Sequence, residues 1–454
     1  MSFNKVIKEF DEVTANFNLT YSGVNIWPYL RFYSLDKLHF KDDRKSKVSS
    51  KKKLQYLGDI FYGFFSWFKS YDALIFNVSG DRKLYNSKWA GKSDFISKYL
   101  GKSLFIELPN KGHFKKSEIP TKNITSKLPL LAIEKVLERF VQVPNELNVL
   151  EKEINSLFSF ESNLTPVYKQ FVARHWVTRF LVKVYQPKFA EVNAAYVDMP
   201  RVLALKQNDV TVIEMQHGNL NPEHHGYQLY NVIDHLLSPD YLLTFGTEER
   251  DFFERSTYIE KSKVFPIGSF YLDYIAKQKK LSESFDAIRK SYDVVIAATG
   301  QDAYDDIFIP FLMEIMNQKK NWACIFIPRS EKESYYRKNF KLSDNTFFVD
   351  DLNTYETILQ CDIHTTVNST CAVEALALGT PNVLYDYQNK AKTYFKHLLE
   401  HDPNSNQFVN SSTDFIKGVE NEISLTKQEV IEKSSYLFVP DFSNNLDKFF
   451  KQLK

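Results

Sequence analysis

The sequence predicts an α/β protein built from two parallel β-sheets, each covered by helices on both faces. Short apolar runs, typical of strands buried in parallel sheets, alternate with stretches of helical pattern along most of the chain. This alternation stops in a polar, lysine-rich stretch at about 277–291 and then starts again. We therefore expect a first domain at 1–276, a linker at 277–291 and a second domain at 292–454, with the last helix a candidate to cross back.

Strands and helices can be assigned in order along the chain. In the first domain, residues 1–70 and about 125–190 have a helical pattern, and 200–208 form a short helix. The strands predicted for the first domain are 72–78, 104–108, 194–198, 210–215, 241–246 and 264–268. Those predicted for the second domain are 294–299, 323–328, 347–349, 363–367 and 382–385. Ligands of such folds bind beyond the carboxyl ends of the strands.

Composition limits the classes of function. The chain has 454 residues, of which 43% are hydrophobic, enough for two large cores. A net charge of +2 gives no reason to expect nucleic acid as a partner. The three cysteines form no Cys-x-x-Cys pair, and the adjacent His224 and His225 would point apart on a strand, so no metal site is expected. The amino-terminal residues lack a signal-peptide pattern, so the expected location is the cytoplasm.

One segment differs from the rest of the chain in its charge and aromatic content. Residues 41–53 are rich in lysine and arginine, and the aromatic stretch 54–68 follows directly. A basic segment beside an aromatic helix is typical of proteins that lie on an anionic membrane surface, here the inner face of the plasma membrane. A solvated loop followed by a buried helix is the alternative interpretation, and the sequence favours neither.

The first candidate site is the motif Gln216-His217-Gly218, which follows the predicted strand 210–215. His217 has the chemistry of a general base or of a phosphate donor, since an ordinary histidine titrates near neutrality. Gly218 lets a ligand approach the backbone closely. Glu223 is a second candidate base. The alternative for His217 is a core histidine with satisfied hydrogen bonds.

The second domain offers two further positions at strand ends. Gly300 and Gln301 follow its first strand, where a glycine allows close approach to a phosphate. Arg329 ends the next strand and can meet a phosphate or a carboxylate with two parallel hydrogen bonds. An ion pair with Glu331 or Glu333 is an equally good interpretation of Arg329.

The most informative segment is the turn Asn368-Ser369-Thr370, which runs into a helix of small residues. Ser369 or Thr370 is the expected N-cap, and a helix amino terminus offers free N–H groups to a phosphate. Gly379 is expected to end this helix in the left-handed conformation. Glu374 lies too late for a capping box, which leaves its carboxylate for a ligand such as ribose. An ordinary capped helix is the alternative.

Four motifs together resemble a known family. They are IEMQHGNLNPEHHGY (213–227), LLTFGTEERDFF (242–253), VFPIGSFYLDY (264–274) and HTTVNSTCAVEALALGTPNVLYD (364–386). Their order and spacing resemble the bacterial GT-B glycosyltransferases of capsule and surface-polysaccharide synthesis, which are similar to Kdo and sialic-acid transferases and to UDP-GlcNAc 2-epimerases. The resemblance covers about residues 190–390.

The resemblance implies two Rossmann-like domains facing across a cleft, with a nucleotide-sugar on the second domain and a glycan or lipid-linked glycan acceptor on the first. Donor phosphates would lie at the Asn-Ser-Thr turn, no metal or other cofactor would be needed, and His217, Glu223 or Asp198 would be the base of an inverting reaction. The implied function is transfer of a sugar to a capsule or lipopolysaccharide acceptor. A related epimerase, a polyol-phosphate transferase and a non-catalytic binding subunit are the alternatives.

Two departures from the family pattern bear on this choice. Several of the related transferases carry His-Pro after the second strand of the second domain, where this chain has Ile327-Pro328-Arg329. The epimerases carry extra acidic residues near their His-Gly loop, whereas Asn219 follows Gly218 here. The second departure weakens the epimerase interpretation.

Overall fold

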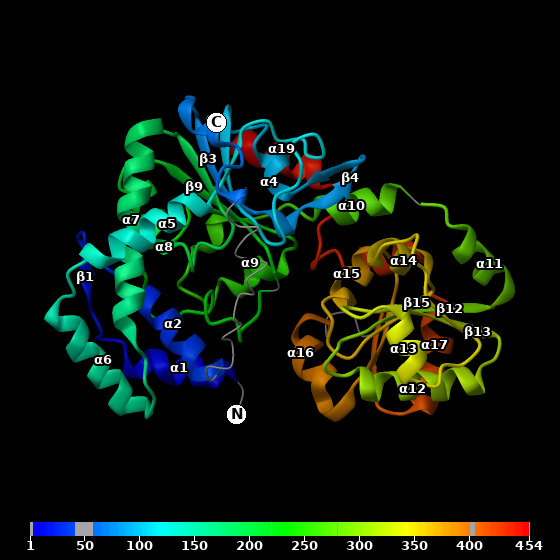
Figure 1. Cartoon of the computed structure of the whole chain (residues 1–454). Coiled ribbons are helices and arrows are strands. Elements are labelled where there is room, and N and C mark those ends of the chain that lie inside the picture. Colours follow the sequence, from blue (N-terminus) through cyan, green and yellow to red (C-terminus); the bar gives the residue numbers. More distant parts are fainter. Residues whose placement is uncertain (1–2, 41–57, 219, 279, 400–404, 454) are drawn as a thin grey trace. The chain divides into compact units, whose positions relative to one another are not determined.

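The computed structural model describes residues 3–40, 58–218, 220–278, 280–399 and 405–453 of the chain. The chain forms two compact units, each built around one parallel sheet (Figure 1). The first unit comprises 1–244, 249–266 and 445–454, and the second comprises 245–248 and 267–444.

The sheet of the first unit has the strand order β11-β10-β9-β8-β3-β6-β7, and all its neighbouring strands run parallel. Its strands are β3 (Ala73–Val78), β6 (Ser103–Leu108), β7 (Ile124–Ser126), β8 (Phe189–Val192), β9 (Thr211–Met215), β10 (Tyr241–Thr244) and β11 (Val264–Pro266). The interior strand β3 is almost wholly buried, as its continuous apolar sequence predicts.

The larger core of the first unit lies between one face of this sheet and a layer of helices. The long helix α7 packs beside α5 and α8, and α1, α2 and α6 complete the layer (Figure 1). These helices are α1 (Phe3–Val13), α2 (Trp27–Phe40), α5 (Leu128–Leu137), α6 (Asn145–Phe158), α7 (Leu164–Tyr185) and α8 (Met199–Lys206). Short elements complete the unit: β1 (Thr20–Tyr21), β2 (Val24–Asn25), β4 (Lys83–Tyr85), β5 (Lys88–Ala90), α4 (Lys92–Ile96) and α9 (Glu248–Phe252).

One predicted strand is wrong. Residues 194–198 form a turn, in which Val197 N donates to Ala194 O, and they lead into α8. The strand lies earlier, at β8, where Glu191 interrupts the apolar run and hides it from a search for continuous apolar residues. Glu191 is nevertheless buried, with only 1% of its surface exposed.

The second unit has a sheet of order β14-β13-β12-β15-β16-β17, again parallel throughout. Its strands are β12 (Val294–Thr299), β13 (Trp322–Ile327), β14 (Thr346–Phe347), β15 (Ile363–Thr365), β16 (Asn382–Tyr385) and β17 (Asn406–Val409). The polar β17 and the short β7 were not predicted, because neither forms a long apolar run.

Helices cover both faces of the second sheet. Residues of α12 and α17 pack on one face, and residues of α10, α11, α14 and α15 pack on the other. The helices of this unit are α10 (Phe270–Lys277), α11 (Glu283–Ser291), α12 (Asp305–Gln318), α13 (Glu333–Asn339), α14 (Thr354–Gln360), α15 (Cys371–Ala377), α16 (Lys390–Leu399), α17 (Ser412–Glu422) and α18 (Lys427–Lys433).

The division between the units differs from the predicted boundaries. The chain passes to the second unit at Ile267, and most of the stretch expected as a linker is α11, which buries Phe285 and Ile288 in the second unit. The last helix, α19 (Phe442–Leu453), begins in the second unit, and its residues from Asn445 onward belong to the first. There Tyr99 Oη donates to Asp447 Oδ1 over 2.7 Å.

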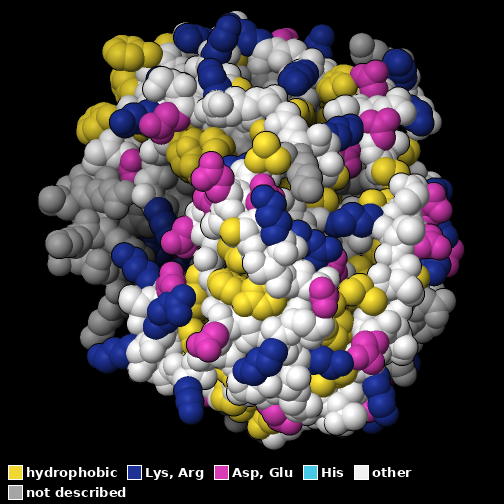
Figure 2. All heavy atoms as spheres, turned by 90° about the vertical axis from the view of Figure 1, so that its right-hand side faces the viewer, with side chains coloured by type: hydrophobic (Ala, Val, Ile, Leu, Met, Phe, Trp, Pro, Cys, Tyr) yellow, Lys and Arg dark blue, Asp and Glu magenta, His cyan; other side chains and the backbone are white. Residues whose placement is uncertain are grey.

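Charged side chains of both signs are interspersed over the face of the molecule seen in Figure 2. Among the described residues drawn on that face, no extended area of a single sign is seen. Such a surface agrees with the small net charge of the sequence.

Candidate functional site

A cavity of about 430 Å³ opens at the carboxyl ends of β12, β13 and β15 in the second unit. Three loops, one after each strand, supply most of its lining. The lining residues are Thr299, Gly300, Gln301, Ile327, Pro328, Arg329, Thr354, Asn368, Ser369, Thr370, Cys371 and Tyr394. The fold therefore brings six residues that were singled out from the sequence to one cavity: Gly300, Gln301, Arg329, Asn368, Ser369 and Thr370.

The loop after β12 is tightly packed around Gly300. A Cβ atom at this position would lie 2.7 Å from Cζ of Phe326 and 3.1 Å from Oδ1 of Asp305, so only glycine fits without a shift. The next residue is fixed by its backbone, because Gln301 N donates to the same Asp305 carboxylate over 2.8 Å. The start of α12 thus holds the floor of the cavity in place.

Arg329 reaches across the cavity rim from the end of β13. Its Nη1 donates to Oε1 of Gln301 over 2.8 Å. Within the described part of the chain, no carboxylate lies within ion-pair distance of its guanidinium. Glu333, one of the two acids considered as its partner, pairs instead with Arg337. The exposed positive charge of Arg329 is thus available to an anion.

The Asn-Ser-Thr turn forms the third side of the cavity. Ser369 Oγ accepts a hydrogen bond from Cys371 N over 3.4 Å, whereas Thr370 has helical dihedral angles and makes no side-chain cap. Oδ1 of Asn368 is buried and has no hydrogen-bond partner in the described structure. A buried acceptor without a partner costs free energy, so this atom indicates a place for a ligand or water donor. Gly379 ends the region with a φ of 76°, which confirms the predicted left-handed residue.

Glu374 does not line this cavity. Its Oε1 accepts a hydrogen bond from Oη of Tyr355 over 2.8 Å. Burial, followed by the nearby Glu374 charge, raises the pKa of Tyr355, so the phenol remains the donor in this pair. A role of Glu374 toward ribose stays a prediction.

A series of buried, hydrogen-bonded side chains lies beneath the cavity and was not predicted from the sequence. His364 on β15 shares a hydrogen bond of 3.0 Å with the hydroxyl of Thr299, and its Nδ1 lies 2.8 Å from Oδ1 of Asn382. The amide of Asn382 donates to Ala372 O and Asn406 Oδ1, which leaves its oxygen to accept from His364 Nδ1. Burial lowers the pKa of His364 to about 4, so the ring is neutral and Nε2 accepts from Thr299.

In the first unit, the Gln-His-Gly motif lies at the carboxyl end of β9. The Gln216 side chain is buried, and its Nε2 donates to Glu249 Oε1 over 2.8 Å and to Gly218 O over 2.9 Å. Gln216 therefore holds the loop rather than pointing to solvent. The His217 side chain is exposed, with Nε2 lying 3.4 Å from Oη of Tyr196.

Lys92 sets the electrostatics of this loop and was not singled out from the sequence. Its ammonium donates to Met215 O over 2.7 Å and to Gln216 O over 2.9 Å. Surrounding protein atoms, followed by the charge of Lys92, lower the pKa of His217 to about 3. The imidazole of His217 is therefore neutral near pH 7.

Beneath the loop, a buried carboxyl group is held by two phenols. Oη of Tyr227 donates to Glu214 Oε1 over 2.5 Å, and Oη of Tyr258 donates to Oε2 over 2.9 Å. Burial raises the pKa of Glu214 to about 7. These contacts place Tyr227, the last residue of the 213–227 motif, in a supporting role.

The two other candidate bases lie in different surroundings. Glu223 is exposed and accepts a hydrogen bond from Phe3 N over 3.3 Å. Asp198 is buried in an ion cluster, 3.1 Å from Arg174, 3.2 Å from Arg201 and 3.7 Å from Lys127. These cations, led by Lys127, outweigh desolvation and hold the pKa of Asp198 far below its usual range. This setting argues against Asp198 as a base, since its carboxylate is buried and already engaged by three cations.

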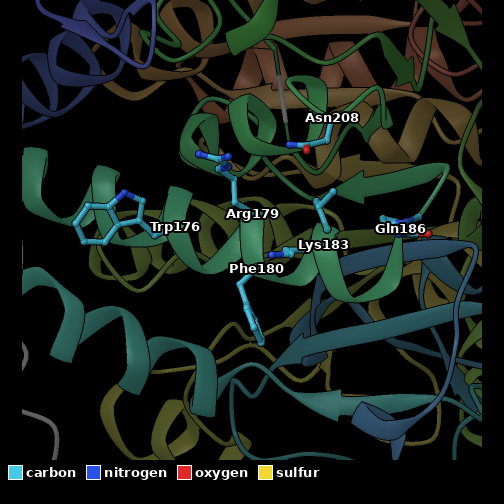
Figure 3. Close-up of a pocket in the computed structure, with 8 residues that line it drawn as sticks. Trp176, Arg179, Phe180, Lys183, Gln186 and Asn208 are labelled. Carbon is cyan, nitrogen blue, oxygen red and sulfur yellow. The ribbon is translucent and has the colours of Figure 1, made fainter.

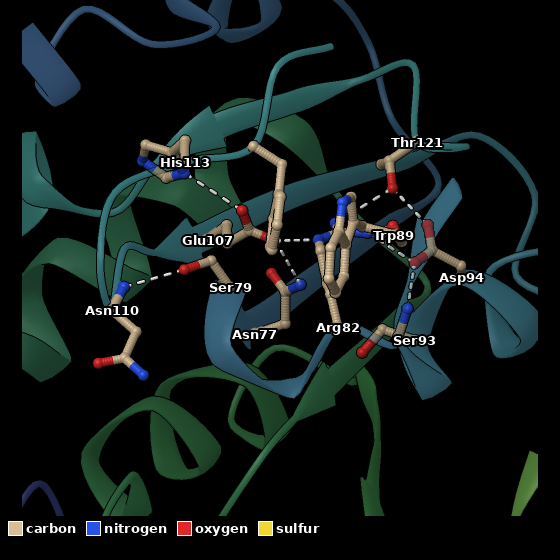
Figure 4. A network of polar contacts seen from close by, with 12 residues as sticks. Asn77, Ser79, Arg82, Trp89, Ser93, Asp94, Glu107, Asn110, His113 and Thr121 are labelled. Atoms are coloured by element: carbon tan, nitrogen blue, oxygen red, sulfur yellow. Dashed lines mark hydrogen bonds and ion pairs between the residues drawn. The ribbon is translucent and has the colours of Figure 1, made fainter. Parts of the chain in front are cut away.

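A second polar network lies at the carboxyl ends of β3 and β6 (Figure 4). Arg82 is at its centre and pairs with Glu107 over 2.7 Å and with Asp94 over 2.8 Å. Glu107 also accepts from Asn77 and lies 3.1 Å from Nδ1 of His113. All of these side chains belong to the first unit, and their mutual bonds fix the loops after both strands.

Comparison with known proteins identifies the fold. No protein-family model and no curated protein matches the sequence. Among solved structures, UDP-GlcNAc 2-epimerase from Methanocaldococcus jannaschii is similar, with a TM-score of 0.52 and 13% identity over 84% of this chain and 99% of that one. The Neisseria meningitidis epimerase bound to UDP-GlcNAc has a TM-score of 0.49 and 11% identity, over 84% of this chain and 99% of that one. The wall teichoic acid polymerase TagF has a TM-score of 0.43 and 12% identity, over 94% of this chain and 99% of that one.

The likeness to the Methanocaldococcus jannaschii enzyme and the two parallel sheets show a GT-B type α/β fold, as the sequence predicts. At this level of identity the likeness shows the fold alone. Among the described residues, no helix is long and apolar enough to cross a bilayer. The same residues contain no group of three or more His, Cys, Asp or Glu side chains placed to hold a metal ion.

Proposed function

We propose that this protein is a metal-independent glycosyltransferase that moves a sugar from a nucleotide-sugar donor to a bacterial surface glycan, of capsule or lipopolysaccharide. The observation that carries the proposal is the cavity of the second unit, where Gly300, Arg329 and Asn368 meet at the ends of three parallel strands. This edge is where such folds bind nucleotides. Similar solved structures include an epimerase bound to UDP-GlcNAc, so UDP-sugars are the first donors to test.

Each side of the cavity would take a different part of the donor. The guanidinium of Arg329 supplies the positive charge and the paired donors that a diphosphate needs. The hydroxyls of Ser369 and Thr370 are donors of the kind that bind phosphate oxygens, and Oδ1 of Asn368 is an acceptor for a sugar or ribose hydroxyl. Glu374 would bind ribose after release from Tyr355. In this account Arg329 neutralises the leaving phosphate without a metal ion.

His217 is the proposed base on the acceptor side. Its neutral ring would accept the proton of an acceptor hydroxyl while that oxygen attacks the anomeric carbon and the nucleotide leaves with the bonding electron pair. Desolvation by surrounding protein atoms, followed by the charge of Lys92, lowers the pKa of His217 and keeps the ring unprotonated, and an anionic substrate nearby would raise its proton affinity. Glu223 remains the second candidate base.

Two substitutions test these roles separately. We expect His217→Ala to retain nucleotide binding and to lower turnover by about a hundredfold, the usual contribution of a general base. We expect Glu374→Ala to weaken nucleotide binding. His235→Ala, at an exposed histidine, is the control and should change neither quantity. Unchanged binding and turnover in both test variants would contradict the assignment.

A nucleotide-sugar epimerase is the second candidate, favoured by the similarity to the Methanocaldococcus jannaschii enzyme over most of both chains. An epimerase needs no acceptor. Incubation of the protein with a UDP-sugar alone, followed by separation of the products, distinguishes the two reactions. A new sugar epimer without acceptor supports the epimerase, and transfer that requires a glycan acceptor supports the transferase. A polyol-phosphate transferase would instead release a nucleoside monophosphate, and a non-catalytic subunit would give no product.

A further inference from the structure

A long apolar groove crosses the surface of the first unit, on the helices that cover its sheet. It has a volume of about 760 Å³ and lies between the 3-10 helix η1 (Phe64–Phe68), α5 and α7. Its lining residues are Ile60, Phe61, Phe64, Trp67, Phe68, Pro129, Leu130, Ile133, Leu137, Trp176, Val177, Phe180, Leu181, Val184 and Tyr185. Large hydrophobic side chains rise from it into solvent: Phe61, Phe68 and Phe180 expose 71%, 73% and 65% of their surfaces.

The groove offers almost nothing to a polar partner. No charged side chain lines it, and the lining polar atoms are those of two tryptophans and one tyrosine. The tyrosine is already engaged, since Oη of Tyr185 donates to Trp67 O over 2.7 Å. A protein partner usually contributes about one hydrogen bond per 100–200 Å² of interface. A groove of this size with so few polar side chains fits hydrocarbon chains better.

A basic pocket adjoins the apolar groove and shares two of its residues. Trp176 and Phe180 line both, and Arg179 and Lys183 supply the charge, as Figure 3 shows along α7. Both cations are exposed, and no carboxylate within the described part of the chain pairs with either. The helix α7 contains no acidic residue. Apolar side chains bordered by cations are the pattern by which proteins bind anionic lipid surfaces.

This surface is separate from the candidate base. Gln186, Pro187 and Asn208 line the basic pocket just before β8 and β9 begin, so the pocket lies at the amino ends of these strands. The His217 loop lies at the carboxyl end of β9. Residues 41–53, the lysine-rich run expected to contact membrane, lie outside the described residues, and the surface defined here does not depend on them.

We propose that the groove and basic pocket of α5, α7 and η1 bind the surface of an anionic lipid bilayer, with the aromatic residues inserted among the acyl chains and Arg179 and Lys183 on the lipid phosphates. The surface would hold the protein at a membrane and leave the other end of the sheet facing the aqueous side. This proposal does not depend on the reaction that the protein catalyses.

Flotation of the full chain with lipid vesicles tests the proposal. One set of vesicles is phosphatidylcholine, and a second contains about 30% phosphatidylglycerol. We expect the wild-type chain to float with the anionic vesicles and less with the neutral ones. The double variant Phe68→Ser/Phe180→Ser should lose at least about tenfold in vesicle affinity, because each phenylalanine loses an apolar contact. Arg179→Glu/Lys183→Glu should lose binding to the anionic vesicles.

Matched controls use exposed residues outside the surface. Val232→Ser replaces a valine that is 89% exposed, and Lys417→Glu reverses a charge on α17. Both should float as the wild type does, and circular dichroism and Tm confirm that all variants fold. Equal flotation of all variants, or no flotation of the wild type, overturns the proposal. A wild-type dimer that becomes monomeric in Phe68→Ser/Phe180→Ser overturns it too, because a second copy then occupies the groove.

Discussion

Arg329 donates from Nη1 to Oε1 of Gln301 over 2.8 Å, and this contact joins the ends of β13 and β12 at the rim of the second-unit cavity. The two residues follow neighbouring parallel strands, whose carboxyl ends meet at one edge of the sheet. The contact orients a guanidinium that has no acidic partner in the described structure. Substitution of Arg329 is therefore a simple test of nucleotide binding in this cavity.

Removal of the Arg329 charge should weaken nucleotide binding. We expect Arg329→Met to raise the Kd for the nucleotide by about tenfold or more, the usual effect of losing a charge-assisted hydrogen bond. Arg329→Lys should recover part of the loss, since it restores charge without the paired donors. Arg337→Met, at an exposed arginine paired with Glu333, is the control. Calorimetric titration measures all three, and equal affinities would show that Arg329 does not bind the nucleotide.

Two glycines of the candidate sites should respond differently to alanine. Gly300→Ala would force its Cβ against Phe326 and Asp305, and we expect it to lower the free energy of unfolding by about 1–3 kcal/mol. A Cβ at Gly218 would meet no atom within 4 Å, so Gly218→Ala should change stability by no more than about 0.5 kcal/mol. Urea unfolding measures both. Equal effects would mean that the loop after β12 is not as tightly packed as described.

Asp198 should contribute to the stability of the fold and not to turnover. Asp198→Asn leaves Arg174, Arg201 and Lys127 without their shared carboxylate, and we expect a loss of about 3–5 kcal/mol, as for other broken buried ion pairs. Turnover per folded molecule should change little. Retained stability with lost turnover would instead support the base that the sequence suggested.

His364 should make the second unit sensitive to acid. Its pKa falls from an ordinary value of 6.5 in the unfolded chain to about 4 in the fold, so the native state binds fewer protons between these values. Stability is therefore complete above pH 6.5 and is lost as the pH falls through this window. His364→Gln has no such titration and therefore no such loss of stability at low pH. The amount by which the free energy of unfolding of His364→Gln lies below that of the wild type should shrink by about 3 kcal/mol between pH 7.5 and 4.

Unfolding curves at several pH values test this dependence. His235→Gln replaces an exposed histidine and should keep the same offset from wild type at every pH. A constant offset for His364→Gln would show that its ring is not held neutral by burial.

Local sequence pattern was sufficient to predict which loops line the second-unit cavity. Gly300, Arg329 and Asn368 were found because each follows an apolar run, and parallel strands bring such positions to one edge. Contacts between residues that lie far apart in the sequence could not be predicted. The role of Asp198 depends on Arg174 and Lys127, which no local pattern links to it.

The same reason explains the residues that were missed. Lys92 lies more than a hundred positions before the carbonyl oxygens that it binds at the end of β9. His364 was recognised only as part of a strand, although a histidine inside a buried apolar strand signals a polar partner. That partner, Asn382, becomes visible only when β15 pairs with β16.

The central claim is that the second-unit cavity binds a nucleotide, and a thermal-shift panel of UDP, CMP, CDP and GDP tests it most directly. A nucleotide at about 100 times its Kd should stabilise the wild-type chain by about 2.7 kcal/mol. We predict that at least one nucleotide raises the Tm and that Arg329→Met and Asn368→Ala reduce the shift at the same concentration. No shift with any nucleotide, or a shift that both variants retain in full, would contradict the account.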